Sequence, residues 1–320
     1  MLMACGDAQW TSRMKRRPRN GVLRPRVPRV KAGLRVAILT LCLALGATIA
    51  DAHDTWLLPS SLRTAVGRRV DLSLTSGMAF PADDFAIKPA RIARASVRLG
   101  GHTSTLASPS SARLALRYRW TPKVPGVATI AVALAPKALT LRGPLIKEYL
   151  NEIDASPELR GQWTEPADAP WREVYTKHAK TFVRVDHRSG SYPGRPDLQM
   201  TEGHDSSWAT PAGLGLEIVP EHDPTMLVAG DSLPVRVLYQ GAPLPGFAVG
   251  IEREHAPGEK ARMAFARTDA GGHALLPLPE AGRMLLKGTQ LRRVHEADVD
   301  WRSDFTTLTI SVHPVGPAKP

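Results

Sequence analysis

The chain has 320 residues, a formal net charge of +12 and two cysteines. Its hydrophobic content of 43% and charged content of 22% are ordinary for a folded protein and exclude a wholly disordered or fibrous chain. Two cysteines are too few for a disulfide scaffold or a four-cysteine zinc site. A charge of +12 spread over the fold would favour a nucleic-acid or anionic-membrane partner, so the position of that charge matters.

The first 52 residues carry most of the excess charge. They hold ten of the 42 basic residues and two of the 30 acidic ones, which leaves a net charge of only +4 for the remainder. An apolar run of 15 residues, 36–50, leads to Ala50-Asp51-Ala52, the small-x-small pattern that a signal peptidase reads. We therefore expect 1–52 to be a cleaved signal peptide with a basic n-region and the product to be periplasmic. A membrane anchor is disfavoured, because a span needs about 20 apolar residues.

Cleavage would also remove both cysteines, Cys5 and Cys42. The mature chain would then have no thiolate, so a metal would have to be held by His, Asp, Glu, Met or backbone atoms. Its nearly balanced charge removes the main support for a nucleic-acid partner. No stretch after residue 52 is apolar enough to span a bilayer.

The segment 53–213 is predicted to be a β-sandwich with a helical insert at about 143–180. Apolar residues alternate with period two in 68–77, 112–120 and 126–136, and Pro and Gly separate these strands. The apolar spacing in 143–154 predicts an amphipathic helix. Residues 171–180 are predicted as a second short helix leading into a strand, and the polar loop 189–213 is the expected domain boundary.

The segment 214–315 is predicted to be a second sandwich, immunoglobulin-like or transthyretin-like. About seven short strands fit in roughly 100 residues, which is typical of such domains; they are expected at 216–224, 232–240, 247–254, 263–269, 273–279, 282–288 and 305–314. The predicted fold class is therefore mainly β, with two sandwich domains, the first carrying the helical insertion.

Several segments together resemble one family. They are HDTWLLPSS (53–61), WREVYTKHAKTFVRV (171–185), GLEIVPEHDPTMLVAGDSLPVRVLYQGAPLPGFAV (215–249) and ARTDAGGHALLPLPEAGRMLLK (266–287). The chain resembles, over essentially all of 53–315, the bacterial periplasmic domain-of-unknown-function family formerly labelled as a nickel transport complex subunit. The resemblance implies an extracytoplasmic two-domain β protein that handles a transition metal in nickel or cobalt uptake. It implies no catalytic residue.

The residue at the new N-terminus is the sharpest candidate for chemistry. If cleavage follows Ala52, the α-amine and the imidazole Nδ1 of His53 can chelate one metal ion, and a further histidine would complete a three-nitrogen set suited to copper. If cleavage follows Ala50, His53 is third in the chain, and a square-planar four-nitrogen set suited to Cu(II) or Ni(II) results. The alternative is structural: residues 56–58 begin the first strand and His53 is a hydrogen-bonding residue at its start.

The further metal ligands that we predict are His178, His187, His204 and Asp205. His178 is the leading candidate, because Tyr175 and His178 would share one face of the predicted helix. No H-x-x-x-H or H-x-H spacing occurs, so a site would have to be assembled from distant segments. The alternatives are that His178 is a surface histidine of that helix and that His204-Asp205 belongs to a polar loop.

The sequence predicts a binding protein and not an enzyme, since it contains no G-x-S-x-G, H-E-x-x-H, P-loop or G-x-G-x-x-G motif. The expected role is transition-metal uptake or homeostasis, with nickel, cobalt or copper as the bound ion and no other cofactor. The expected partner is a membrane metal transporter. The alternative function is a structural or protein-interaction module of the cell envelope that binds no metal.

Overall fold

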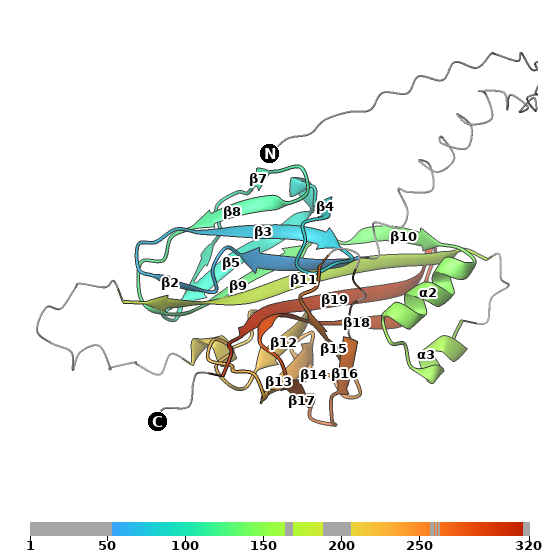
Figure 1. The fold of residues 1–320 in the computed structure, drawn as a ribbon. Coiled ribbons are helices and arrows are strands. Elements are labelled where there is room, and N and C mark those ends of the chain that lie inside the picture. Colours follow the sequence, from blue (N-terminus) through green and yellow to red (C-terminus); the bar gives the residue numbers. More distant parts are fainter. Residues whose placement is uncertain are drawn as a thin grey trace, which may run out of the picture. The chain divides into compact units, whose positions relative to one another are not determined.

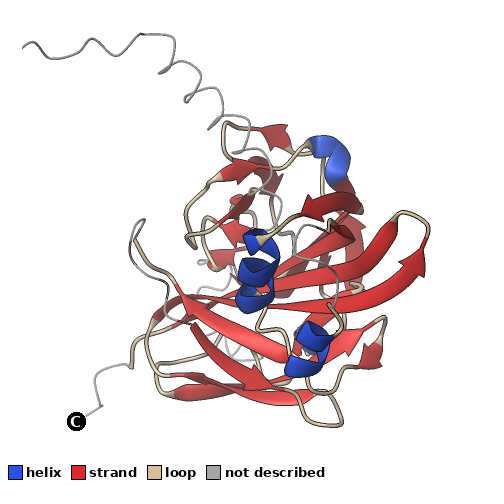
Figure 2. Ribbon diagram, turned by 90° about the vertical axis from the view of Figure 1, so that its right-hand side faces the viewer, coloured by secondary structure: helices blue, strands red, loops and turns tan. Residues whose placement is uncertain are grey.

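The computed structural model describes residues 53–163, 169–187, 206–256, 259, 261 and 263–315, all within one compact unit. The predicted signal peptide, His204 and Asp205 lie outside the described residues. Strands make up most of the described chain and helices little of it (Figure 2). The predicted mainly β class is therefore confirmed.

Strands in the described ranges form three sheets, which we name A, B and C. Sheet A has the order β1 (Asp54–Pro59), β3 (Val70–Gly77), β8 (Leu116–Trp120) and β7 (Ser110–Ser111), with β4 (Phe85–Ala86) beside β3. Sheet C has the order β12 (Leu216–Pro220), β13 (Asp231–Tyr239) and β14 (Ala242–Pro243), with β17 (His273–Leu278) also beside β13.

Sheet B is the largest and contains strands from both halves of the chain. Its order is β16 (Met263–Arg267), β15 (Ala248–Arg253), β18 (Gly282–Glu296), β19 (Val299–Val312), β11 (Trp171–Asp186), β9 (Gly126–Leu134), β5 (Ile92–Leu99) and β6 (His102–Thr105). β2 (Arg63–Ala65) and β10 (Lys137–Leu141) also pair with β11. The predicted boundary near residue 213 falls between β11 and β12, so it divides the chain but not this sheet. The division into two domains stays a prediction.

Sheets A and C lie on opposite faces of sheet B (Figure 1). One core forms between sheet A and strands β5, β9 and β11, and a second forms between sheet C and strands β15, β18 and β19. Strand β11 serves both cores, because Val183 packs in the first and its neighbour Phe182 in the second. Successive side chains of a strand point to opposite faces, so a strand between two layers is buried on both.

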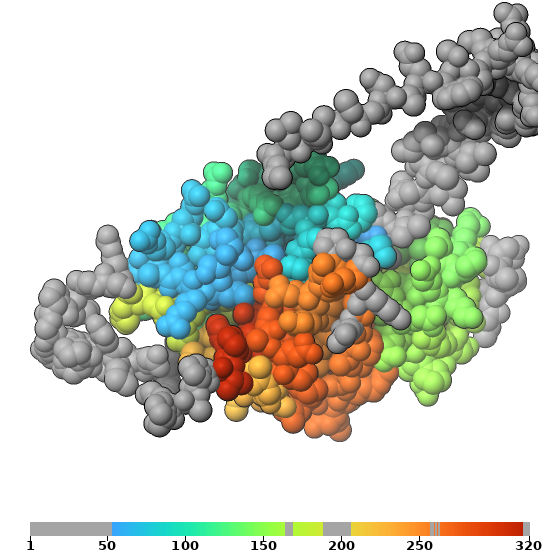
Figure 3. Space-filling model, viewed as in Figure 1, coloured from blue at the N-terminus to red at the C-terminus, as the bar shows by residue number. Residues whose placement is uncertain are grey.

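Two α-helices, α2 (Pro144–Glu152) and α3 (Pro157–Gly161), follow β10. A short 3₁₀ helix (Pro89–Arg91) precedes β5, and another (Ser207–Ala209) precedes β12. Apolar residues of α2, among them Ile146 and Leu150, pack beside the parallel indole rings of Trp171 and Trp301, whose centroids are 4.2 Å apart. In the space-filling view the green helical segment borders the orange C-terminal strands (Figure 3).

The predicted helix at 171–180 is wrong. These residues form the first ten positions of β11, which pairs with β10 and β19 along this stretch. Their side chains alternate between the two faces of sheet B, and Trp171, Glu173, Tyr175 and Lys177 share one face and are all buried. Buried charged residues mask the apolar alternation that would otherwise mark a strand.

Candidate functional site: the start of β1 and its charged pocket

His53 is buried at the start of β1, with 5% of its surface exposed. Its ring stacks on Phe85 of sheet A, at 5.2 Å between centroids and 25° between planes. Its carbonyl oxygen accepts a hydrogen bond from the Nζ of Lys177, which projects from β11. The residue predicted to follow the signal peptide is therefore held between sheets A and B.

The next residue, Asp54, belongs to a buried chain of charges. The Nζ of Lys287 on β18 lies 2.5 Å from Asp54 Oδ2 and 2.8 Å from Glu252 Oε2. The other oxygen of Glu252 lies 3.1 Å from the Nε2 of His255. Burial alone would lower the pKa of Lys287, but Asp54 and Glu252 outweigh it and raise that pKa well above its ordinary value. Lys287 thus links β1 to β15 through charge.

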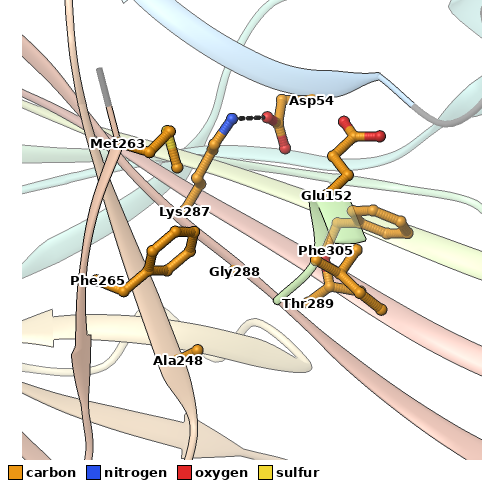
Figure 4. Close-up of a pocket in the computed structure, with 10 residues that line it drawn as sticks. Asp54, Glu152, Ala248, Met263, Phe265, Lys287, Gly288, Thr289 and Phe305 are labelled. Atoms are coloured by element: carbon orange, nitrogen blue, oxygen red, sulfur yellow. Dashed lines mark hydrogen bonds and ion pairs between the residues drawn. The ribbon is translucent and has the colours of Figure 1, made fainter. Parts of the chain in front are cut away.

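A small pocket lies beside this chain of charges (Figure 4). Asp54, Lys287 and Glu152, the last residue of α2, form its polar side, and Phe265 and Phe305 contribute apolar walls. Desolvation of its carboxylate by the surrounding protein atoms, together with repulsion from Asp54, raises the pKa of Glu152 to about 7, although the residue as a whole is exposed. The pocket therefore places two carboxylates and one ammonium group next to the predicted N-terminus.

Gly288 in this pocket leaves no room for a side chain. A Cβ there would lie 2.5 Å from Phe247 Cζ and 2.7 Å from the carbonyl oxygen of Ala248. We expect Gly288→Ala to lower the free energy of unfolding by about 1–3 kcal/mol, because a backbone atom has to move. Gly161→Ala is the matched control, since no atom lies within 4 Å and the change is expected to be neutral or slightly stabilising. Urea unfolding of both variants checks this, and equal midpoints would contradict it.

Lys177 and Glu173 are buried charged residues on the same face of β11 that the sequence reasoning missed. Lys177 Nζ lies 5.2 Å from the ring centroid of Tyr175 and 5.4 Å from that of Phe305. Glu173 accepts hydrogen bonds from Trp171 Nε1 at 2.6 Å, Tyr149 OH at 3.0 Å and the hydroxyl of Ser303. Trp171, Glu173, Tyr175 and Lys177 are spaced two residues apart, and this spacing could have indicated a strand with one buried face.

His178 points to the other face of sheet B from Lys177, because the two are consecutive in a strand. Lys177 contacts His53, so the structure does not bring His178 and His53 together. The Nε2 of His178 lies 3.3 Å from Asp304 Oδ1, and its Nδ1 is buried with no hydrogen-bond partner among the described residues. His178 is therefore not the surface histidine of a helix that the sequence suggested as the alternative.

His187 follows the end of β11 and is exposed. It is nine residues beyond His178, about 30 Å along an extended strand. Among the residues that the structure describes, no group of three or more His, Cys, Asp or Glu side chains is placed to hold a metal ion. No helix in the described part of the chain has the length and apolar character that crossing a membrane requires.

The chain belongs to the family described as a domain of unknown function (DUF4198), whose sequence model matches residues 50–290. No curated protein matches it. The description of this family names no function. The nickel-transport label that the sequence resemblance suggested is not part of it.

Solved structures with similarity to the chain include two bacterial or adhesion-protein structures and one murine protein. The Yersinia pseudotuberculosis adhesin InvE is 11% identical, with 82% of this chain and 59% of that chain covered and a TM-score of 0.20. A tetra-tandem repeat from the extending region of a large adhesion protein is 11% identical, with 81% and 49% covered and a TM-score of 0.20. Murine CEACAM1b is 7% identical, with 82% and 100% covered and a TM-score of 0.17. The chain spans less than two thirds of the length of the first two.

Proposed function

We propose that the protein is a periplasmic, non-enzymatic binding protein for a transition metal, nickel, cobalt or copper, and that it serves uptake or homeostasis of that metal. The metal is captured at the mature N-terminus by His53 and passed to a membrane transporter. The export signal predicted in 1–52 and the resemblance to proteins labelled as nickel transport subunits support this proposal.

The observation that carries the proposal is the anchored position of His53. Its carbonyl is bound by Lys177 and its ring by Phe85, and the next residue is bound by Lys287. Cleavage after Ala52 would place the new α-amine on the same residue as the imidazole, so both nitrogens of a chelate are fixed in advance. A fixed chelate loses little conformational entropy when the metal binds. Further ligands would come from water, backbone atoms or residues outside the described ranges, His204 and Asp205 among them.

The test starts from the secreted protein with its authentic N-terminus, which mass spectrometry of the terminal peptide identifies. Titration with Cu(II) and Ni(II) is expected to give an affinity at least 100-fold above that of His53→Ala. A protein with Gly-Ser-Gly-Ser added before the authentic N-terminus keeps the imidazole but moves the amine too far away for either chelate, and it should bind as weakly as His53→Ala. His102→Ala is the matched control, an exposed histidine of β6 that is not among the predicted ligands, and its loss should leave the affinity unchanged.

The pH dependence gives a second readout. An imidazole ligates only when neutral, so the affinity is expected to fall as the pH drops below about 6. If the authentic protein binds neither metal more tightly than His53→Ala, the proposal is overturned, and the structural or protein-interaction module of the envelope becomes the better hypothesis.

A further inference from the structure

Met78 follows the end of β3, beside the end of β1 that begins next to His53. The antiparallel pairing of β1 with β3 runs up to the residues directly after His53 and directly before Met78, so one further step sets these two residues opposite each other. Side chains two residues apart in a strand share a face. Thr55 and Ser76 are two residues from His53 and Met78 respectively, and their hydroxyl oxygens are 2.6 Å apart. His53 and Met78 therefore start from the same face of sheet A.

The imidazole of His53 lies over the end of β3. It stacks on Phe85 of β4 at 5.2 Å between ring centroids. Because β1 and β4 pair with opposite edges of β3, and strands on either side of a third are about 10 Å apart, both rings must lean over β3, close to where Met78 follows it. Met78 is 69% exposed and His53 only 5%, so the flexible side chain of Met78 can approach the ring from the solvent side.

Packing does not account for a methionine at this position. Met78 belongs to none of the hydrophobic cores in the described part of the chain. Its sulfur is a soft ligand, and thioethers select Cu(I), whereas imidazole nitrogen suits copper and nickel alike. A thioether beside an imidazole is therefore a pair of donors that suits reduced copper better than nickel or cobalt.

We propose that Met78 is a copper ligand and that the site at His53 binds Cu(I) through an imidazole nitrogen of His53 and the thioether sulfur of Met78. This inference rests on the proposed function, since it requires His53 to bind a metal, and it narrows the three candidate metals to copper. The nitrogen chelate of His53 holds Cu(II) or Ni(II), whereas Met78 adds a ligand for the reduced ion alone. Cu(I) is bound as supplied, and no electron transfer takes place.

The test titrates the secreted protein, with its authentic N-terminus, with Cu(I) under anaerobic conditions and separately with Ni(II). Met78→Leu keeps an apolar side chain of similar size but removes the sulfur. It is expected to lower the Cu(I) affinity by roughly tenfold or more and to leave the Ni(II) affinity unchanged. Met226→Leu is the matched control, because Met226 is also exposed and lies in the segment before β13, so its change should alter neither affinity. Met78 is exposed, so the variant is expected to fold.

Methyl NMR of the methionines identifies the sulfur ligand directly. Ag(I), a redox-inert ion that prefers the same soft ligands, should shift the methyl signal of Met78 in the unaltered protein. The signals of Met226, which is exposed, and of Met284, which is buried in the core of the second sandwich, should stay in place. A shift of Met226 as large as that of Met78 would overturn the inference.

The outcomes separate this inference from the proposed function. If Met78→Leu binds Cu(I) as tightly as the unaltered protein, while His53→Ala weakens Ni(II) binding, Met78 is not a ligand and the proposed function stands. If Met78→Leu weakens Cu(I) binding but His53→Ala does not, the sulfur belongs to a site without His53, and the inference is overturned. If neither variant changes the affinity for either metal, both proposals fail.

Discussion

Replacing Glu217 by alanine is expected to lower the free energy of unfolding by about 3–5 kcal/mol, the cost of breaking a buried ion pair from one side. Glu217 and Lys180 are each 1% exposed, and Lys180 Nζ lies 2.6 Å from Glu217 Oε1. The same carboxylate accepts backbone N–H groups at 2.7–3.1 Å from Ala212, Gly213 and Leu214. The variant would leave one ammonium and three amides without their acceptor.

The control is the other side of the pair. Lys180→Met is expected to cost less, about 2–3 kcal/mol, because Glu217 keeps its three amide donors. The double variant Lys180→Met/Glu217→Ala should be less destabilised than the sum of the two single changes, because it leaves no buried charge unpaired, whereas each single change does. Urea unfolding followed by tryptophan fluorescence measures all three. A loss below 1 kcal/mol for Glu217→Ala would show that this ion pair does not hold sheets B and C together.

The same carboxylate gives a pH dependence with a defined sign. Burial would raise the pKa of Glu217, but Lys180 and the amide donors outweigh it and hold that pKa below its ordinary range. The stability that it contributes is therefore present above the unfolded pKa of about 4.3 and is lost as the pH falls through the lower folded pKa. The difference in stability between the unaltered protein and Glu217→Gln should accordingly shrink below about pH 4.

Period-two alternation predicted strands of two kinds. The segment 273–279 became β17, in which exposed and buried residues alternate, so its core face shows directly in the sequence. The segments 68–77 and 126–136 became β3 and β9, which are buried on both faces, and their apolar alternation between Pro and Gly still marked them as strands. The helix at 143–154 was likewise confirmed as α2, whose buried Ile146, Tyr149 and Leu150 follow helical spacing.

The first ten residues of β11 could not be predicted in the same way. The strand lies between two cores, and its buried charges are balanced by partners that are remote in sequence. Lys177 meets the carbonyl of His53, 124 residues away, and Lys180 meets Glu217, 37 residues away. A single sequence contains no signal for such pairs, so the segment was assigned by its local spacing.

The residues of the candidate site also differ in whether the signal for them is local in sequence. His53 was found because the small-x-small pattern that precedes it is local in sequence. Lys287 was not found, because its contact with Asp54 spans 233 residues. The apolar run around it, Met284–Leu286, indicated only a strand. The sequence thus singles out His53 as a candidate, whereas the groups that fix its position are visible only in the fold.

Replacing Lys287 by methionine is expected to lower the free energy of unfolding by about 3–5 kcal/mol and to loosen the start of β1. Its ammonium lies between Asp54 and Glu252, which are 16% and 3% exposed in their side chains, and its removal leaves two carboxylates facing each other. Hydrogen exchange at the amides of Asp54–Leu57 should quicken by more than the global loss of stability explains. The reason is that the variant breaks the only salt bridge that β1 makes within the described part of the chain.

Lys123→Met is the matched control, since Lys123 is exposed and its change should stay within about 0.5 kcal/mol. The raised pKa of Lys287 means that its contribution is fully present below the unfolded pKa of about 10.4 and is lost only as the pH rises through the still higher folded pKa. The difference in stability between the unaltered protein and Lys287→Met should therefore not decrease between pH 7 and about 10. A difference that fades between pH 7 and 9 would show that the ammonium of Lys287 is not what fixes Asp54, and with it His53.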